Sequence, residues 1–74
     1  MTLNELRESD RVFVHAADVA GILQCDPHGI RLMARKYPET YLGGSVMLSG
    51  KEGRRTKIMR ERFLAWVDGR TIDN

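Results

Sequence analysis

The sequence predicts an α+β fold in which two short helices, joined by a tight turn, precede a β-hairpin and a final helix. Three observations predict it. Apolar residues recur at helical spacing on both sides of Asp26-Pro27, a dipeptide that marks a helix start. Two alternating segments flank the glycine-bracketed stretch 50–53, which has the length of a hairpin turn. A last helical stretch carries its aromatic residues on one face.

The N-terminal residues 1–10 are polar and net acidic, and we expect a flexible or loosely docked segment there. Thr2 and Glu5 have the spacing of a capping box, so a short helix can begin at this point. One or two helical turns without a partner are marginal in water. The β-prone run 11–14 then predicts an edge strand that leads into the first helix of the pair.

The first helix of the pair is expected to begin after His15 and to end at Gln24-Cys25. His15 takes the N-cap position, and Asp18 falls at the third helical position, where a carboxylate favours the helix dipole. We expect Cys25 to fill an apolar position in the turn between the two helices.

The second helix is expected over 27–37. Asp26 can cap the free backbone N–H groups at its start, and Pro27 suits the first helical position because its missing donor costs nothing there. Pro38 ends the helix, because the residue before a proline is steered away from helical backbone angles. The apolar spacing predicts a buried stripe formed by Ile30, Met33, Ala34 and Tyr37. A different face carries the basic residues His28, Arg31, Arg35 and Lys36.

A loop, 39–44, and a hairpin, 45–59, follow the helix pair. We expect Tyr41 and Leu42 of the loop to contact the core. The hairpin strands alternate between apolar and polar residues, as strands with one buried face do. The turn and the second strand carry the cations Lys51, Arg54, Arg55 and Lys57.

The final helix is expected over 60–68, with Gly69 as its C-terminal cap and a disordered tail at 70–74. Its apolar face is formed by Phe63, Trp66 and Val67. In sequence order, residues 11–69 are therefore a helix-turn-helix followed by a wing.

Length and composition bound the class of protein. Seventy-four residues make one small domain with a modest core. No apolar run is long enough to span a bilayer, and the N-terminus lacks the layout of a secretory signal. The one cysteine excludes an internal disulfide framework and fits a reducing compartment, so we expect a cytoplasmic protein.

The distribution of charge favours a polyanionic partner. The net charge is only +2, but residues 31–62 hold nine Lys or Arg against three acids. The remaining residues hold three bases against seven acids. This asymmetry predicts a cationic surface on one part of the molecule, the alternative being ordinary solvated charge.

A helix that is apolar on one side and cationic on the other, mounted on a partner helix, suits the major groove of DNA. Arg31 and Arg35 can bond a guanine edge or a phosphate with two prongs, the alternative being a solvated face that pairs with Glu39. Amides in the first turn, at His28 and Gly29, attract phosphate. Gly29 lets a nucleic-acid backbone approach or reflects crowding against the first helix.

The hairpin cations can neutralise phosphates, or they can keep an edge strand from aggregating. We predict double-stranded DNA as the partner. The predicted DNA-binding residues are His28, Gly29, Arg31, Arg35, Lys36, Lys51, Arg54, Arg55 and Lys57.

An enzyme is not expected. The sequence shows no phosphate-binding glycine loop, paired carboxylates or nucleophile with a base, and the chain is short for a catalytic cleft. Cys25, His28 and His15 are too few for a zinc site, so no metal or cofactor is predicted.

The pattern V-x-x-A-D-V-A-x-I-L-x-x-x-P-x-x-I-R, from Val14 to Arg31, and I-x-R-x-x-F-x-x-W, from Ile58 to Trp66, resembles the small winged-helix proteins of phages and mobile elements. The excisionase group, related to the MerR-type DNA-binding domain, is closest. Two features depart from it: His15 replaces the usual hydroxyl cap, and Gln24-Cys25 replaces the usual glycine-plus-aliphatic turn.

The resemblance implies sequence-specific DNA binding in recombination or transcription regulation. It also implies an integrase or recombinase, or further copies of the chain, as partners on DNA. The alternative is a protein-interaction adaptor on the same fold, similar to a small-terminase or regulatory module. An exposed apolar patch around Tyr41, Met47 or Met59 would favour that adaptor.

Overall fold

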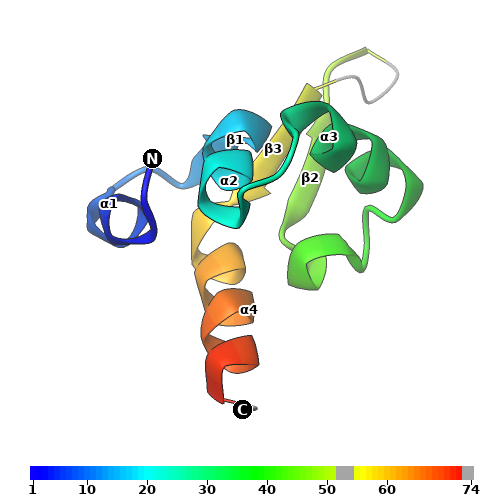
Figure 1. Cartoon of the computed structure of the whole chain (residues 1–74). Coiled ribbons are helices and arrows are strands. Elements are labelled where there is room, and N and C mark those ends of the chain that lie inside the picture. Colours follow the sequence, from blue (N-terminus) through cyan, green and yellow to red (C-terminus); the bar gives the residue numbers. More distant parts are fainter. Residues whose placement is uncertain (52–54, 73–74) are drawn as a thin grey trace.

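The computed structural model describes residues 1–51 and 55–72, which form an α+β fold (Figure 1). In chain order the elements are α1 (Leu3–Glu8), β1 (Phe13–His15), α2 (Ala16–Leu23), α3 (Pro27–Lys36), the 3-10 turn η1 (Tyr41–Gly44), β2 (Val46–Ser49), β3 (Arg55–Met59) and α4 (Arg60–Ile72). The strands pair antiparallel in the order β1-β3-β2, so β3 is central. The predicted α+β class and the predicted order of elements are confirmed.

One face of the sheet packs against the helices. Val14, Ile58 and Val46 are directly opposite one another across the three strands, and all three are buried. The outward face carries the alternate residues, among them Lys57 and Met47. The predicted hairpin alternation and the predicted edge position of β1 are confirmed. The predicted turn 50–53 lies partly outside the described residues.

The caps of the helix pair are those the sequence predicts. The His15 backbone N–H donates to Asp18 Oδ2 at 3.1 Å, and the His28 N–H donates to Asp26 Oδ1 at 3.0 Å. Gln24 ends α2 in the left-handed conformation, with φ 56°. These local bonds satisfy backbone donors that a helix start leaves open, and they define where both helices begin.

The predicted buried stripe of α3 is too wide. Ile30 and Ala34 are buried, but the exposed fractions of Met33 and Tyr37 are 40% and 45%. Tyr37 is the C-cap, with φ −131° and ψ 59°, so its side chain leaves the helical repeat. Met33 lies beside Ile30 on the helix surface, but only Ile30 and Ala34 of α3 are buried in the core. The prediction for Cys25 is also wrong, because it lies exposed at the surface turn between the two helices.

The helix α1 is attached to α4. The Glu5 N–H donates to the Thr2 hydroxyl at 3.2 Å, which confirms the predicted capping, and Leu6 is fully buried. Arg7 forms an ion pair with Asp68 of α4, and hydrogen bonds from Arg7 are the main reason that the pKa of the Asp68 carboxyl is lowered. Residues 1–10 thus contain a packed helical turn as well as polar surface.

The helix α4 supplies the largest buried side chain, Phe63. Its ring centroid lies 5.9 Å from that of the partly buried Trp66, and both belong to the core, as predicted. The prediction that Gly69 caps this helix is wrong, since α4 continues to Ile72. A glycine permits a left-handed stop but does not impose one. Of the predicted disordered tail, 70–72 is helical and 73–74 lies outside the described residues.

The loop after α3 turns through a left-handed segment that packs against α4. Leu42 and Gly43 have φ 52° and 69°, and Leu42 is buried as predicted. The buried Ser45 hydroxyl donates to the Leu42 carbonyl at 2.8 Å and closes the turn. A Cβ added at Gly43 would lie 2.6 Å from Trp66 Cδ1, so this position excludes a side chain on steric grounds as well as conformational ones.

Gly43→Ala should therefore destabilise the protein by about 2–3 kcal/mol, because alanine is strained at positive φ and its Cβ displaces Trp66. Urea denaturation followed by fluorescence measures this, since Trp66 is the one tryptophan. The matched control is Gly69→Ala, where an added Cβ meets nothing within 4 Å and helix propensity predicts a gain of up to about 1 kcal/mol. Equal stability of Gly43→Ala and the wild type would contradict the prediction.

Candidate functional site

The exposed side of α3 is rich in basic residues. The helix is buried through Ile30 and Ala34 only, and the opposite side faces solvent. At about 100° per residue, this outward side gathers five consecutive neighbours on the helix surface. They are His28, Arg31, Leu32, Arg35 and Lys36, all exposed.

A pocket of about 390 Å³ joins α3 to the central strand. It is lined by His15, Ala16, Arg31, Arg55, Thr56 and Lys57. Three of the predicted residues, Arg31, Arg55 and Lys57, therefore meet here from two separate elements. The described lining holds no carboxylate, so basic side chains predominate among the residues around the pocket. Such a concentration of one sign of charge attracts an anion.

The register of the sheet opens this pocket. His15, the last residue of β1, is opposite Lys57, so Arg55 and Thr56 extend β3 beyond the end of β1. The chain turns into α2 at this point, and α3 packs against α2, which brings Arg31 to the uncovered edge of β3. Thr56 Oγ1 is buried and has no hydrogen-bond partner among the described residues.

Two predicted lysines lie over aromatic rings. Lys57 Nζ is 5.5 Å from the ring centroid of Phe13, and Lys36 Nζ is 5.5 Å from that of Tyr37. A cation over a ring face is attracted by the ring quadrupole, typically by about 0.5–1 kcal/mol at exposed sites. The two ammonium groups are thus partly positioned, one beside the pocket and one at the end of α3.

The remaining predicted DNA-binding residues that the structure describes do not line this pocket. His28 and Gly29 occupy the first turn of α3, and Lys51 is exposed just beyond β2. A Cβ added at Gly29 meets nothing within 4 Å, so crowding against α2 does not explain this glycine. The prediction for Arg54 lies outside the described residues. The structure therefore unites Arg31 with the hairpin and leaves Lys51 at its distal end.

Two features of the site were not predicted. His15 and Thr56 line the pocket because of strand register, for which a single sequence gives no signal. Leu32 is 53% exposed at the centre of the cationic face. Helical spacing could have found it, because Leu32 is two residues from both Ile30 and Ala34 and so projects from the opposite side.

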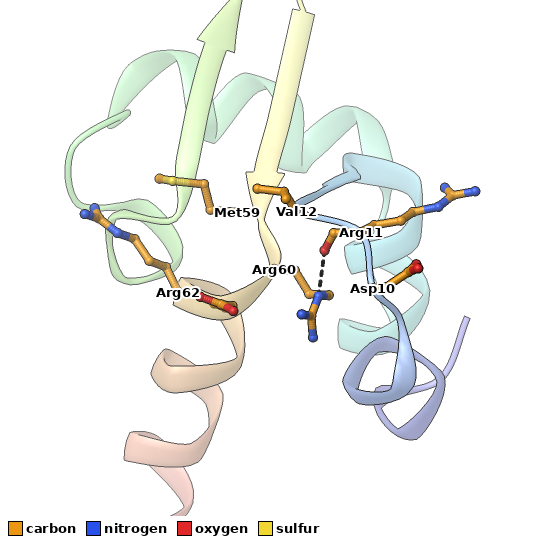
Figure 2. A pocket seen from close by; sticks show the side chains of 7 residues that line it. Asp10, Arg11, Val12, Met59, Arg60 and Arg62 are labelled. Atoms are coloured by element: carbon orange, nitrogen blue, oxygen red, sulfur yellow. Dashed lines mark hydrogen bonds between the residues drawn. The ribbon is translucent and has the colours of Figure 1, made fainter.

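A second pocket, of about 280 Å³, has a structural role (Figure 2). It is lined by Asp10, Arg11, Val12, Met59, Arg60, Glu61 and Arg62. Arg60 points into it and its Nε donates to the Arg11 carbonyl at 2.7 Å, while the Arg60 backbone N–H donates to the Val12 carbonyl at 3.0 Å. These bonds tie the two residues that precede β1 to the start of α4. Because the lining carries both signs of charge, this pocket is less suited to a polyanion.

The outward face of the sheet also shows apolar surface. Met47 is 41% exposed, and Met59 and Phe13, which are opposite each other on neighbouring strands, are partly buried. Lys57 is opposite Met47 and interrupts this surface with a charge. The patch expected of an interaction adaptor is therefore present in part.

Comparison of the chain with protein-family models, with curated proteins and with solved structures finds no match. Within residues 1–51 and 55–72, no group of three His, Cys, Asp or Glu side chains is placed to hold a metal ion. None of the helices in the same ranges combines the length and the apolar character needed to cross a membrane.

Proposed function

We propose that this chain is a winged helix-turn-helix protein that binds double-stranded DNA sequence-specifically. In this proposal α3 enters the major groove and the β2–β3 hairpin contacts the sugar–phosphate backbone. The observation that carries it is the pocket in which Arg31 of α3 meets Arg55 and Lys57 of β3. The resemblance to excisionases supports a role in recombination or in transcription regulation on mobile elements.

The proposed roles follow from where each cation lies. The major groove admits one α-helix, and the exposed side of α3 would face its base edges. The shared pocket lies between that helix and the hairpin, where a DNA strand would pass. Arg31, together with Arg55 and Lys57, is therefore assigned to a phosphate, which fixes register. His28 and Arg35, farther around α3, are assigned to the groove.

One copy would cover little DNA. A single small module typically buries about 600–1,000 Å² of protein surface on DNA, and the net charge here is only +2. High affinity would then need several copies on adjacent sites or a partner recombinase bound beside the chain. Both arrangements leave the contacts of the individual module unchanged.

Titration of a fluorescent random duplex at several salt concentrations tests the proposal. If four to six of the predicted cations replace counterions on phosphates, the logarithm of the binding constant should fall against the logarithm of salt with a slope of roughly −4 to −5. The affinity should therefore drop steeply between 50 and 200 mM salt. Absent binding at low ionic strength, or binding that salt does not change, would refute DNA as the partner.

The second candidate is a protein-interaction adaptor, and the exposed Met47 on the outward sheet face favours it. This candidate needs the apolar part of that face, whereas DNA binding needs the cationic pocket. Met47→Lys should abolish partner binding by an adaptor but should leave DNA binding intact or slightly stronger. Binding of duplex by this variant with wild-type affinity would favour the DNA-binding candidate over the adaptor.

A further inference from the structure

We infer that Leu32 determines specificity by packing against the C5-methyl group of a thymine in the major groove. The inference rests on the proposed DNA-binding function and goes beyond it, because it assigns part of the target sequence. Leu32 is 53% exposed, whereas the apolar residues Ile30 and Ala34 of the same helix are buried in the core.

Leu32 lies on the side of α3 opposite to the buried residues. At 100° per residue, Leu32 lies about 180° from the midpoint of the two buried residues Ile30 and Ala34. It therefore projects farthest from the body of the protein, along the direction in which the helix would approach a groove floor. No other residue of α3 lies closer to that direction.

Basic residues surround Leu32 on the surface of α3. The residues three and four positions away on a helix surface are its contacts, and here they are His28, Gly29, Arg35 and Lys36. Three of these carry or can carry positive charge, and all are exposed or partly exposed. An apolar protein partner would have to desolvate this ring of cations, which is costly. On DNA, the same cations meet phosphates and base acceptors, so charge complementarity selects the duplex as the occupant.

Gly29 leaves open space beside Leu32. A Cβ at this position would meet nothing within 4 Å, so packing within the protein does not require a glycine. Glycine nevertheless weakens a helix relative to alanine. The space it leaves, one turn before Leu32, allows a base edge to approach the leucine side chain closely.

The chemistry of the groove then identifies the base. Among the four bases, thymine alone presents an apolar group in the major groove, its C5-methyl. Leucine has no hydrogen-bonding group with which to recognise the polar edges of the others. Burial of the thymine methyl group against the Leu32 side chain should favour a site with thymine over one without it by about three- to tenfold in affinity.

The test replaces thymine by deoxyuridine, which lacks the methyl group but keeps the same pairing and the same groove acceptors. A target site is first selected from randomised duplexes with the wild-type chain, and each thymine is then replaced singly. We expect one replacement to weaken wild-type binding by about three- to tenfold and to leave the binding of Leu32→Ala unchanged. Met33→Ala is the matched control, since Met33 is exposed but lies off this face, and it should keep the full sensitivity.

Thermal melting of Leu32→Ala should match that of the wild type, because an exposed side chain contributes little to stability. If no thymine replacement affects the wild type, or if Leu32→Ala is as sensitive as the wild type, the inference is wrong while the proposed function stands. If the wild-type chain binds no duplex at low salt, the proposed function is wrong and the inference falls with it.

Discussion

Phe63→Ala should lower the free energy of unfolding by about 3–5 kcal/mol, as is typical for removal of a buried phenylalanine. Phe63 is the largest fully buried side chain, and the face of α4 that carries it packs against the rest of the core. A chain of 74 residues is expected to have a total stability of only roughly 4–11 kcal/mol. The substitution should therefore remove a large part of the stability, and circular dichroism in urea would show it.

Two further variants make this prediction specific. Phe63→Leu keeps most of the apolar volume and should cost clearly less than the alanine variant. Val12→Ala removes an apolar side chain of which 69% is exposed, and should change stability by no more than about 0.5 kcal/mol. A Phe63→Ala protein with the wild-type urea midpoint would show that the core is not built around this ring.

The predictions that succeeded on the fold rest on local chemistry. Asp26 and Pro27 define the start of α3 through one hydrogen bond and one fixed backbone angle, and these need nothing from the rest of the chain. The same holds for the backbone bond between His15 and Asp18, although histidine is not a preferred cap. Caps and apolar periodicity therefore predicted the helix pair and the hairpin in order.

The predictions that failed depend on tertiary packing, that is, on which side chains other elements of the fold cover. Met33 and Tyr37 fit the apolar repeat of α3, but only two residues of that helix contact the core in a chain this small. Gly69 resembles a helix stop, yet no further signal there opposes helix continuation, and α4 runs on. Periodicity gives the direction of a side chain, whereas burial also needs a neighbour to cover it.

The candidate site also combines features that the sequence predicts with features that depend on packing. The run of charge in 31–62 predicts a cationic surface, and its members Arg31, Arg35 and Lys51 are exposed. The meeting of Arg31 with Lys57 could not be predicted, because it depends on where β1 ends against β3. A shift of that register by one residue would turn the alternate side chains of β3 to the other face.

Arg31→Ala should weaken binding to every duplex by about tenfold, while the preference among sequences stays unchanged. The reason is the phosphate role assigned to Arg31, since a phosphate contact contributes affinity that does not depend on sequence. The magnitude of the salt slope should fall by about one, because one fewer counterion is displaced. Salt-dependent titrations of the selected site and of a random duplex measure both quantities.

The stability of this variant distinguishes a binding role from a structural one. Arg31 shares its pocket with Arg55 and Lys57 and with no described carboxylate, so its removal breaks no ion pair within that lining. Its removal should leave the melting temperature unchanged or slightly raised, whereas a structural arginine would lower it. Arg62→Ala is the matched control, because it removes the same charge from the other pocket and should change affinity much less.

Two results would overturn the assignment of Arg31. A loss confined to the selected site, with random duplex unaffected, would show that Arg31 contacts a base edge instead of a phosphate. A fall in the melting temperature parallel to the loss of affinity would show that the arginine supports the fold. Tenfold weaker binding to both duplexes, by a protein that is as stable as the wild type or more so, is the result expected for the loss of a phosphate contact.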